Sequence, residues 1–150
     1  TGPFPKEAVL SGIEWIDKWK LMTSIRTLEH AGQADKDGRK RILSRTEILP
    51  PYNICTESYM IIFVCDSEDE IHQAYKYIKT KFVRFMMSLV TSTQAINKMS
   101  FSLVPLQDFT PNSDIDWSQS VADIDKQLYK KYGLTTDEQQ FIESMIKPME

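Results

Sequence analysis

The chain has 150 residues, of which 41% are hydrophobic and 26% are charged, and its formal net charge is −3. This length and composition predict one folded domain with its own core and argue against a disordered chain. The longest apolar run, Met60 to Cys65, is far shorter than the roughly 20 residues that a membrane span requires, and the first residues lack the features of a signal peptide. We therefore expect a cytoplasmic protein without a membrane partner.

Charge is distributed unevenly along the sequence. Eight basic and three acidic residues lie between Lys18 and Arg45, and five basic residues but no acidic one lie between Lys76 and Lys98. Nine acidic and four basic residues follow from Asp108 onward. The sequence therefore predicts a basic front and an acidic back, a distribution typical of a domain that contacts a polyanion with one side.

The first half of the chain contains signals for one helix and several strands. Apolar residues at helical spacing predict a helix over residues 6–19, and residues 20–26 have the pattern of a strand. The polar stretch 30–38, with glycine near both ends, predicts an exposed loop, and residues 39–44 predict a returning strand. Residues 59–65 are apolar on both faces, which favours a central strand.

The strongest helix signal begins at Ser67, which forms a capping box with Glu70. One apolar stripe at helical spacing then continues to Leu89 and predicts a single long helix. The stripe consists of Ile71, Ala74, Tyr75, Ile78, Phe82, Phe85, Met86 and Leu89. A short strand is expected over residues 101–104.

Two short helices are expected near the C-terminus. The first spans residues 121–132 and stops at Gly133, and the second begins at the capping box of Thr135 with Glu138. The whole pattern predicts an α+β fold with a mixed or antiparallel sheet, a long central helix packed on it and two short C-terminal helices. Residues 1–150 form a single domain in this interpretation, with 117–150 as its helical C-terminal subregion.

Signatures of catalysis are missing from the sequence. It contains no Gly-rich nucleotide loop, no HExxH motif and no CxxC pair, and Cys55 and Cys65 fit buried free thiols better than a disulfide or zinc site. Residues 49–52, Leu-Pro-Pro-Tyr, resemble the (Asn/Asp)-Pro-Pro-Tyr signature of amino-methyltransferases. Because Leu49 cannot accept a hydrogen bond from a target amine, we expect a turn there instead. No catalytic and no metal-binding residue is predicted.

The acidic residues 66–70 are open to two interpretations. At the start of a helix, acidic side chains interact favourably with the helix dipole, and this is the favoured interpretation. The less favoured alternative is a nuclease-like carboxylate cluster.

Basic and amide side chains gather around the expected loop and on the expected long helix. Arg and Lys neutralise phosphates, and Arg and Gln also make bidentate contacts to purine edges in the major groove. The candidate DNA-contacting residues are Lys20, Arg26, His30, Gln33, Arg39, Lys40, Arg41, Arg45, Lys79, Thr80, Lys81, Arg84, Thr93 and Gln94.

Several blocks resemble the C-terminal region of restriction–modification methyltransferases that modify adenine at N6. Residues 77–85, YIKTKFVRF, are similar to the Y-x-x-T-K-F-x-R-F block of that family, and residues 55–59, CTESY, to its C-T-[ED]-[ST]-Y block. Further blocks follow in the family's order, so that the resemblance covers roughly residues 20–150. They are Thr93-Gln94, Val104–Phe109, Leu128–Leu134 and Phe141–Met149.

The resemblance implies a target-recognition domain that binds double-stranded DNA. In such enzymes a separate catalytic domain of the same chain binds S-adenosyl-L-methionine and methylates the adenine, and some relatives also carry an endonuclease. This chain, which lacks an initiator Met, is then expected to be a C-terminal fragment that is not catalytic alone and holds no cofactor. The alternative is a structural or interaction domain that braces the catalytic domain or a partner subunit, a role that suits the acidic C-terminal helices.

Overall fold

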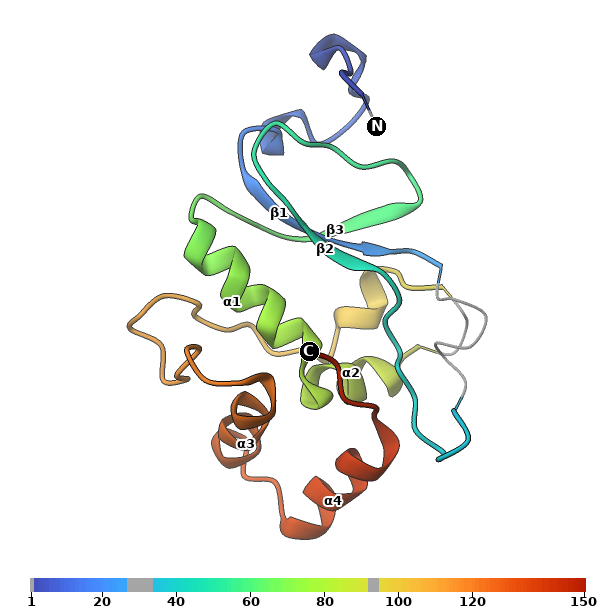
Figure 1. Cartoon of the computed structure of the whole chain (residues 1–150), viewed down its shortest axis with the longest axis vertical. Helices are drawn as coiled ribbons and strands as arrows, with labels where there is room; N and C mark the ends of the chain where they lie inside the picture. Colours follow the sequence, from blue (N-terminus) through green and yellow to red (C-terminus); the bar gives the residue numbers. More distant parts are fainter. Residues whose placement is uncertain (1, 27–33, 92–94) are drawn as a thin grey trace.

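The computed structural model describes residues 2–26, 34–91 and 95–150 (Figure 1). Within these residues the chain forms a three-stranded antiparallel sheet and four α-helices. Helix α1 packs against all three strands, and the other α-helices lie beyond it on the same side of the sheet (Figure 1). The expected α+β class with an antiparallel sheet is confirmed.

Strand β1 (Trp19–Ser24) is the central strand of this sheet. It pairs antiparallel with β2 (Thr46–Leu49) on one side and with β3 (Tyr59–Cys65) on the other. Four of the six residues of β1 are buried, whereas every residue of β3 is half-buried. The prediction that residues 59–65 form a central strand is therefore wrong. Their apolar run reflects partial cover on both faces, which does not require a neighbouring strand at both edges.

The predicted long helix is not confirmed as one element. Helix α1 (Glu68–Lys79) and helix α2 (Lys81–Ser88) are separated by Thr80, whose ψ of 150° is extended. The Thr80 hydroxyl donates to a carbonyl in the last turn of α1 and accepts from an N–H in the first turn of α2. One extended residue changes the direction of the helix axis, while both helices keep an apolar face toward the core. The apolar stripe in the sequence therefore did not reveal the break.

The N-terminal region also differs from its prediction. Residues 6–19 form two short 3₁₀ turns, η1 (Lys6–Ala8) and η2 (Ile13–Trp15), instead of a helix. Gly12 between them has a left-handed φ of 73°, which interrupts right-handed helical geometry at that point.

Two expected strands are absent from the described residues. Residues 101–104 follow a 3₁₀ turn, η3 (Lys98–Phe101), which begins at the capping box of Asn97. Residues 39–44 contain a tight turn, and regular pairing with β1 begins only at Thr46. In both cases the sequence predicted a strand where the tertiary fold uses turns.

The two C-terminal helices are confirmed. Helix α3 (Val121–Lys131) is followed by Gly133, whose φ of 65° is left-handed, and α4 (Thr136–Met145) begins at the predicted Thr135 capping box. No α-helix among the described residues is long and apolar enough to cross a membrane.

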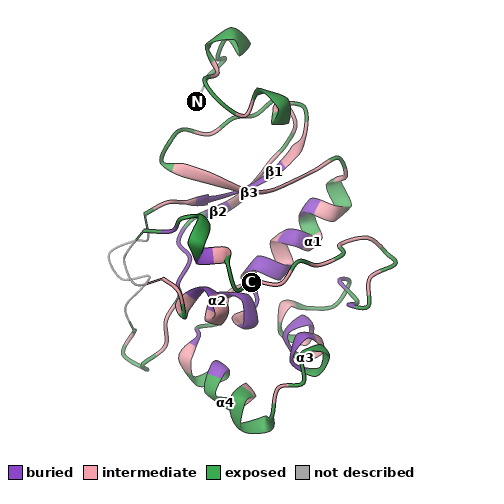
Figure 2. Cartoon of the chain, turned by 180° about the vertical axis from the view of Figure 1, so that it is seen from behind, coloured by how far each residue is buried: buried purple, intermediate pink, exposed green. Residues whose placement is uncertain are grey.

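One continuous core joins the sheet to the helices. The buried stretches of α1, α2 and α3 lie toward the interior of the fold (Figure 2). Residues 117–150 do not pack separately, because their buried side chains belong to the same core. These side chains are Trp117, Ile124, Leu128, Tyr129, Ile142 and Ile146.

Candidate nucleic-acid interface

The candidate DNA-contacting residues fall into three groups. Some lie outside the described residues, others are used inside the fold, and the rest lie on the surface. Those outside the described residues are His30, Gln33, Thr93 and Gln94.

Lys20 belongs to the group used inside the fold. It is 4% exposed in the central strand, and burial lowers the pKa of its ammonium. Its Nζ donates to the carbonyls of Trp15, Ile16 and Lys18 at 3.0, 3.2 and 2.6 Å. All three donors are used to hold the N-terminal segment to the sheet, so this position does not fit the expected DNA contact.

Arg84 and Thr80 are also buried, each at 0% exposure. The Arg84 guanidinium donates from Nη2 to the carbonyl of Lys79 at 2.9 Å and from Nη1 to the carbonyl of Arg41 at 3.3 Å. Burial lowers its pKa to about 10. We expected both residues on the polar face of one helix. Because α2 is a separate helix that begins after Thr80, the Arg84 side chain faces the core instead.

Lys79 and Lys81 are half-buried and engaged by neighbours. The Lys81 ammonium forms an ion pair with Glu143 of α4. The Lys79 ammonium lies 4.4 Å from the centre of the Tyr75 ring, and burial lowers its pKa. The helix face around Lys81 and Arg84 therefore offers few unengaged charges to a nucleic acid.

The remaining candidates define the basic segment, residues 36–45, together with Arg26 beside it. A turn shapes this segment: Ile42 has a φ of 68°, and the N–H of Leu43 donates to the carbonyl of Arg41 at 2.8 Å. This is a three-residue γ-turn. It directs Ile42 and Leu43 into the core while Arg41 stays exposed.

The C-terminal end of the chain anchors the basic segment. Lys40 and Ile146 form a parallel bridge, in which Lys40 N donates to the carbonyl of Met145 and Lys147 N donates to the carbonyl of Lys40, at 2.7 and 2.8 Å. Asp35 accepts from the N–H of Arg39 at 3.0 Å and pairs with Lys147 at 3.1 Å, and these bonds lower its pKa. The segment therefore has a defined backbone position.

Arg26 follows β1 and lies next to the end of the basic segment. Its carbonyl accepts from the hydroxyls of Ser24 and Ser44 at 2.8 and 3.1 Å, and its backbone forms a bridge with Ala95. Figure 1 shows the segment running from a loop tip past α2 to the start of β2, close to the end of β1.

Most cations of this region form no ion pair with an acidic side chain in the described part of the chain. Arg45 pairs with Glu47 at 2.6 Å, and Arg39 makes a longer contact of 3.4 Å to Asp37. The ion pairs formed among the described residues include none of the other basic side chains of the region. These unpaired side chains are Arg26, Lys36, Lys40 and Arg41.

Asp125 was missed by sequence reasoning. It is 3% exposed in α3, and its carboxylate accepts from the backbone N–H groups of Lys81 and Phe82, both at 2.9 Å. Burial raises its pKa to about 6 despite these bonds. In the sequence Asp125 is one acid among several in an amphipathic helix, and no local pattern marks it as buried.

A pocket of about 350 Å³ lies next to Asp125 between α3 and α4. Lys81, Glu143 and Tyr129 line it, and the Tyr129 hydroxyl donates to Glu143 at 3.0 Å. Lys81 and Glu143 form an ion pair with each other, and Lys126 at the pocket pairs with Asp123.

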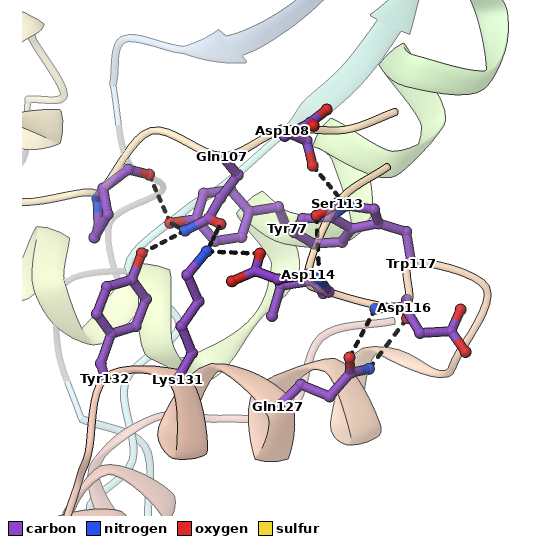
Figure 3. Close-up of polar contacts among 12 residues, drawn as sticks. Tyr77, Gln107, Asp108, Ser113, Asp114, Asp116, Trp117, Gln127, Lys131 and Tyr132 are labelled. Carbon is purple, nitrogen blue, oxygen red and sulfur yellow. Dashed lines mark hydrogen bonds and ion pairs between the residues drawn. The ribbon is translucent and has the colours of Figure 1, made fainter. Parts of the chain in front are cut away.

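A second polar network connects the linker before α3 to α1 and α3 (Figure 3). The Gln107 amide donates to the hydroxyls of Tyr77 and Tyr132 at 3.3 and 2.7 Å. The Lys131 ammonium donates to Gln107 at 3.0 Å and pairs with Asp114 at 2.8 Å. The Tyr77 hydroxyl lies in the interior, where burial raises its pKa. This network fixes the linker and presents no free group.

The residues with possible catalytic chemistry occupy structural positions. The acidic residues 68–70 form the first turn of α1, as the helix-dipole interpretation predicted. Among the described residues, no three His, Cys, Asp or Glu side chains are grouped to hold a metal ion. Cys55 and Cys65 are free and half-buried, and burial raises the pKa of both thiols.

Residues 50–53 form the predicted turn after β2. The N–H of Asn53 donates to the carbonyl of Pro50 at 3.2 Å, and Tyr52 has a φ of 65° with 79% of its side chain exposed. Tyr52 N also donates to the carbonyl of Ile16 at 2.6 Å, which places this turn against the N-terminal segment. Both segments carry exposed apolar side chains. They are Phe4, Leu10, Ile13, Trp15, Tyr52 and Ile54.

Comparisons of the chain with known protein families, with curated proteins and with solved structures found no match.

Proposed function

We propose that this chain is the DNA-binding, target-recognition domain of a restriction–modification adenine methyltransferase. The observation that supports DNA contact best is a group of cations on and beside one anchored segment that form no ion pair with any residue the structure describes. They are Arg26, Lys36, Lys40 and Arg41. Phosphate neutralisation supplies most of the affinity of such contacts, and unpaired cations supply it without first breaking an ion pair. The assignment to this enzyme class rests on the sequence blocks.

The anchored backbone supports specific rather than purely electrostatic binding. Phosphate contacts set the register of a protein on a duplex, and base contacts then read the sequence. A segment fixed by the Lys40–Ile146 bridge and by Asp35 loses little conformational entropy when DNA binds. In this proposal the catalytic domain of the same chain, in the cytoplasm, binds S-adenosyl-L-methionine and methylates the adenine that this domain helps to position.

The proposal is tested by fluorescence anisotropy with a mixed-sequence DNA duplex at low and at physiological salt. The chain should bind, and its affinity should fall as salt rises. The variant Lys40→Ala with Arg41→Ala should bind more weakly, with a salt slope smaller by about 2, because each lost phosphate contact removes roughly 0.9 from the slope.

A matched control removes two charges elsewhere. Lys126 and Lys130 are exposed on α3 in the acidic half of the chain, and Lys126→Ala with Lys130→Ala should leave affinity and salt slope unchanged. Binding that does not depend on salt, or equal losses in both double variants, would contradict DNA contact by the basic segment.

The exposed aromatic side chains of Trp15 and Tyr52, on two segments joined by the Tyr52–Ile16 hydrogen bond, favour a second candidate function, docking to the catalytic domain or to a partner subunit. Trp15 and Tyr52 are large aromatic side chains of the kind that anchor protein interfaces, and both are exposed. In the parent enzyme, Trp15→Ser with Tyr52→Ser should then weaken the attachment of this domain, measured as increased proteolysis between the domains. Unchanged proteolysis would rule out this role for Trp15 and Tyr52. The basic segment lies at a different part of the fold, so both functions are compatible (Figure 1).

A further inference from the structure

We propose that Arg84 is a positioning residue for DNA binding, which holds the turn that presents Arg41 and its basic neighbours. The inference rests on the proposed function, since it concerns how the basic segment is held for contact with DNA. It assigns a role to a buried cation that no ion pair among the described residues neutralises.

The link between Arg84 and the basic segment is a single shared carbonyl. The Arg41 oxygen accepts from the N–H of Leu43 at 2.8 Å, which closes the γ-turn, and from Nη1 of Arg84 at 3.3 Å. Both lone pairs of this oxygen are therefore used, one within the turn and one by α2. Arg84 acts on the backbone of Arg41 and leaves the Arg41 side chain exposed.

The turn at Ile42 requires such support. Ile42 has a φ of 68°, a left-handed value that is strongly disfavoured for a β-branched residue. Strained backbone of this kind persists only where the surroundings hold it, and it is found preferentially at functional sites. Here the surroundings are the buried Ile42 and Leu43 side chains, the pairing of Lys40 with Ile146 and the guanidinium of Arg84.

The geometry also explains why the residue is arginine. Its Nε and Nη2 donate to the carbonyl of Lys79 at 3.2 and 2.9 Å, at the end of α1, while Nη1 points to Arg41. A planar guanidinium can donate to both carbonyls at the same time, whereas the ammonium of a lysine places all its donors on one atom. The guanidinium therefore connects the break between α1 and α2 to the basic segment.

The test is a double-mutant cycle on DNA affinity. Arg84→Lys and Arg84→Met are each measured alone and combined with Arg41→Ala, by anisotropy with the mixed-sequence duplex. If Arg84 acts through the segment, Arg84→Lys should reduce affinity about fivefold and the salt slope by about 1, as expected for one displaced phosphate contact. In the Arg41→Ala background the same substitution should cost less than about twofold, because coupled residues are not additive.

Hydrogen exchange gives an independent readout. The Leu43 amide closes the turn, so it should exchange faster in Arg84→Lys than in the wild type, while amides of β1 keep their protection. Ile71→Val, a buried substitution on α1 away from the segment, serves as the stability control. It should lower the melting temperature without changing DNA affinity.

Each outcome is decisive. If Arg41→Ala alone leaves DNA binding unchanged, the proposed contact by this segment fails and the role of Arg84 fails with it. If Arg41→Ala weakens binding but Arg84→Lys does not, or if Arg84→Lys costs as much in both backgrounds, only the positioning role is overturned. If Arg84→Met does not fold, the folded Arg84→Lys variant still decides.

Discussion

The carboxylate of Asp125 accepts a hydrogen bond at 2.9 Å from the backbone N–H of Phe82, 43 residues earlier in the chain. Together with a bond from the N–H of Lys81, this contact lets α3 satisfy two N–H groups at the start of α2, in addition to the Thr80 cap. These bonds from α3 hold the N-terminus of α2 and with it the position of Arg84.

The first prediction concerns pH. The pKa of Asp125 is raised from 3.8 to about 6 in the folded chain, so between these values the folded state binds a proton that the unfolded state does not. The contribution of this group to stability therefore increases as pH falls through about 6, by ~3 kcal/mol in total. Asp125→Asn should remove this contribution. The measurement is the free energy of unfolding of both proteins in denaturant at pH 7 and pH 4.5.

Other acids titrate in the same range, so the informative quantity is the difference between wild type and Asp125→Asn. That difference should shift in favour of the wild type as pH falls. A difference that is constant with pH, or that shifts in favour of the variant, would show that burial does not dominate the titration of Asp125.

The second prediction concerns the break between the helices. Thr80→Ala removes the hydroxyl that accepts from Val83 and donates to Tyr77, and should lower the free energy of unfolding by about 1–2 kcal/mol. Thr80→Ser keeps the hydroxyl and should cost less than half as much. Urea titrations compare the two, and equal losses would mean that the methyl group matters more than the cap.

The third prediction separates a buried from an exposed lysine. Lys20→Met leaves three carbonyls without their donor and should lower the free energy of unfolding by about 2 kcal/mol or more, with DNA affinity unchanged while the chain stays folded. Lys36→Met should show the reverse pattern, because Lys36 is exposed on the basic segment. Thermal melts and anisotropy on the same samples give both quantities. A loss of affinity in folded Lys20→Met would restore Lys20 as a DNA contact.

The fourth prediction concerns the linker network. The Tyr77 hydroxyl donates to the carbonyl of Pro105 at 2.8 Å inside the fold, so Tyr77→Phe should destabilise the chain by about 1–2 kcal/mol. Tyr132→Phe removes a hydroxyl from a more exposed ring of the same network and should cost about 0.5 kcal/mol or less, since water replaces the lost partner. Chemical denaturation distinguishes them, and a larger effect at Tyr132 would contradict the assignment of Tyr77 as the buried anchor.

Several features of the fold were predictable because they depend on neighbours in sequence. The N-cap at Ser67, the capping box at Thr135 and the stop at Gly133 involve residues within one helical turn, and the structure confirms all three. At Ser67 the bond from the Glu70 N–H to the Ser67 hydroxyl forms, but the return bond of the predicted capping box is absent among the described residues. The α+β class followed in the same way, because helical and strand patterns are visible in short windows.

The break at Thr80 and the edge position of β3 were not predictable by this reasoning. An apolar stripe reports which side chains face the core, and it stays the same whether the helix is continuous or interrupted by one extended residue. An apolar strand reports burial of its faces, but it carries no information on how many strands flank it.

For the candidate interface, too, one part was predictable from the sequence and another part depended on the tertiary structure. The abundance of basic residues between Lys18 and Arg45 is a property of the sequence, and it predicted the segment on which the proposed DNA contact rests. Which of these cations are unpaired depends on groups distant in sequence: carbonyls surround Lys20 and Arg84, while Arg26 and Arg41 have no acidic neighbour among the described residues. A basic side chain has the same identity in both settings, and only the surrounding atoms determine whether its charge stabilises the fold or is free to bind a phosphate.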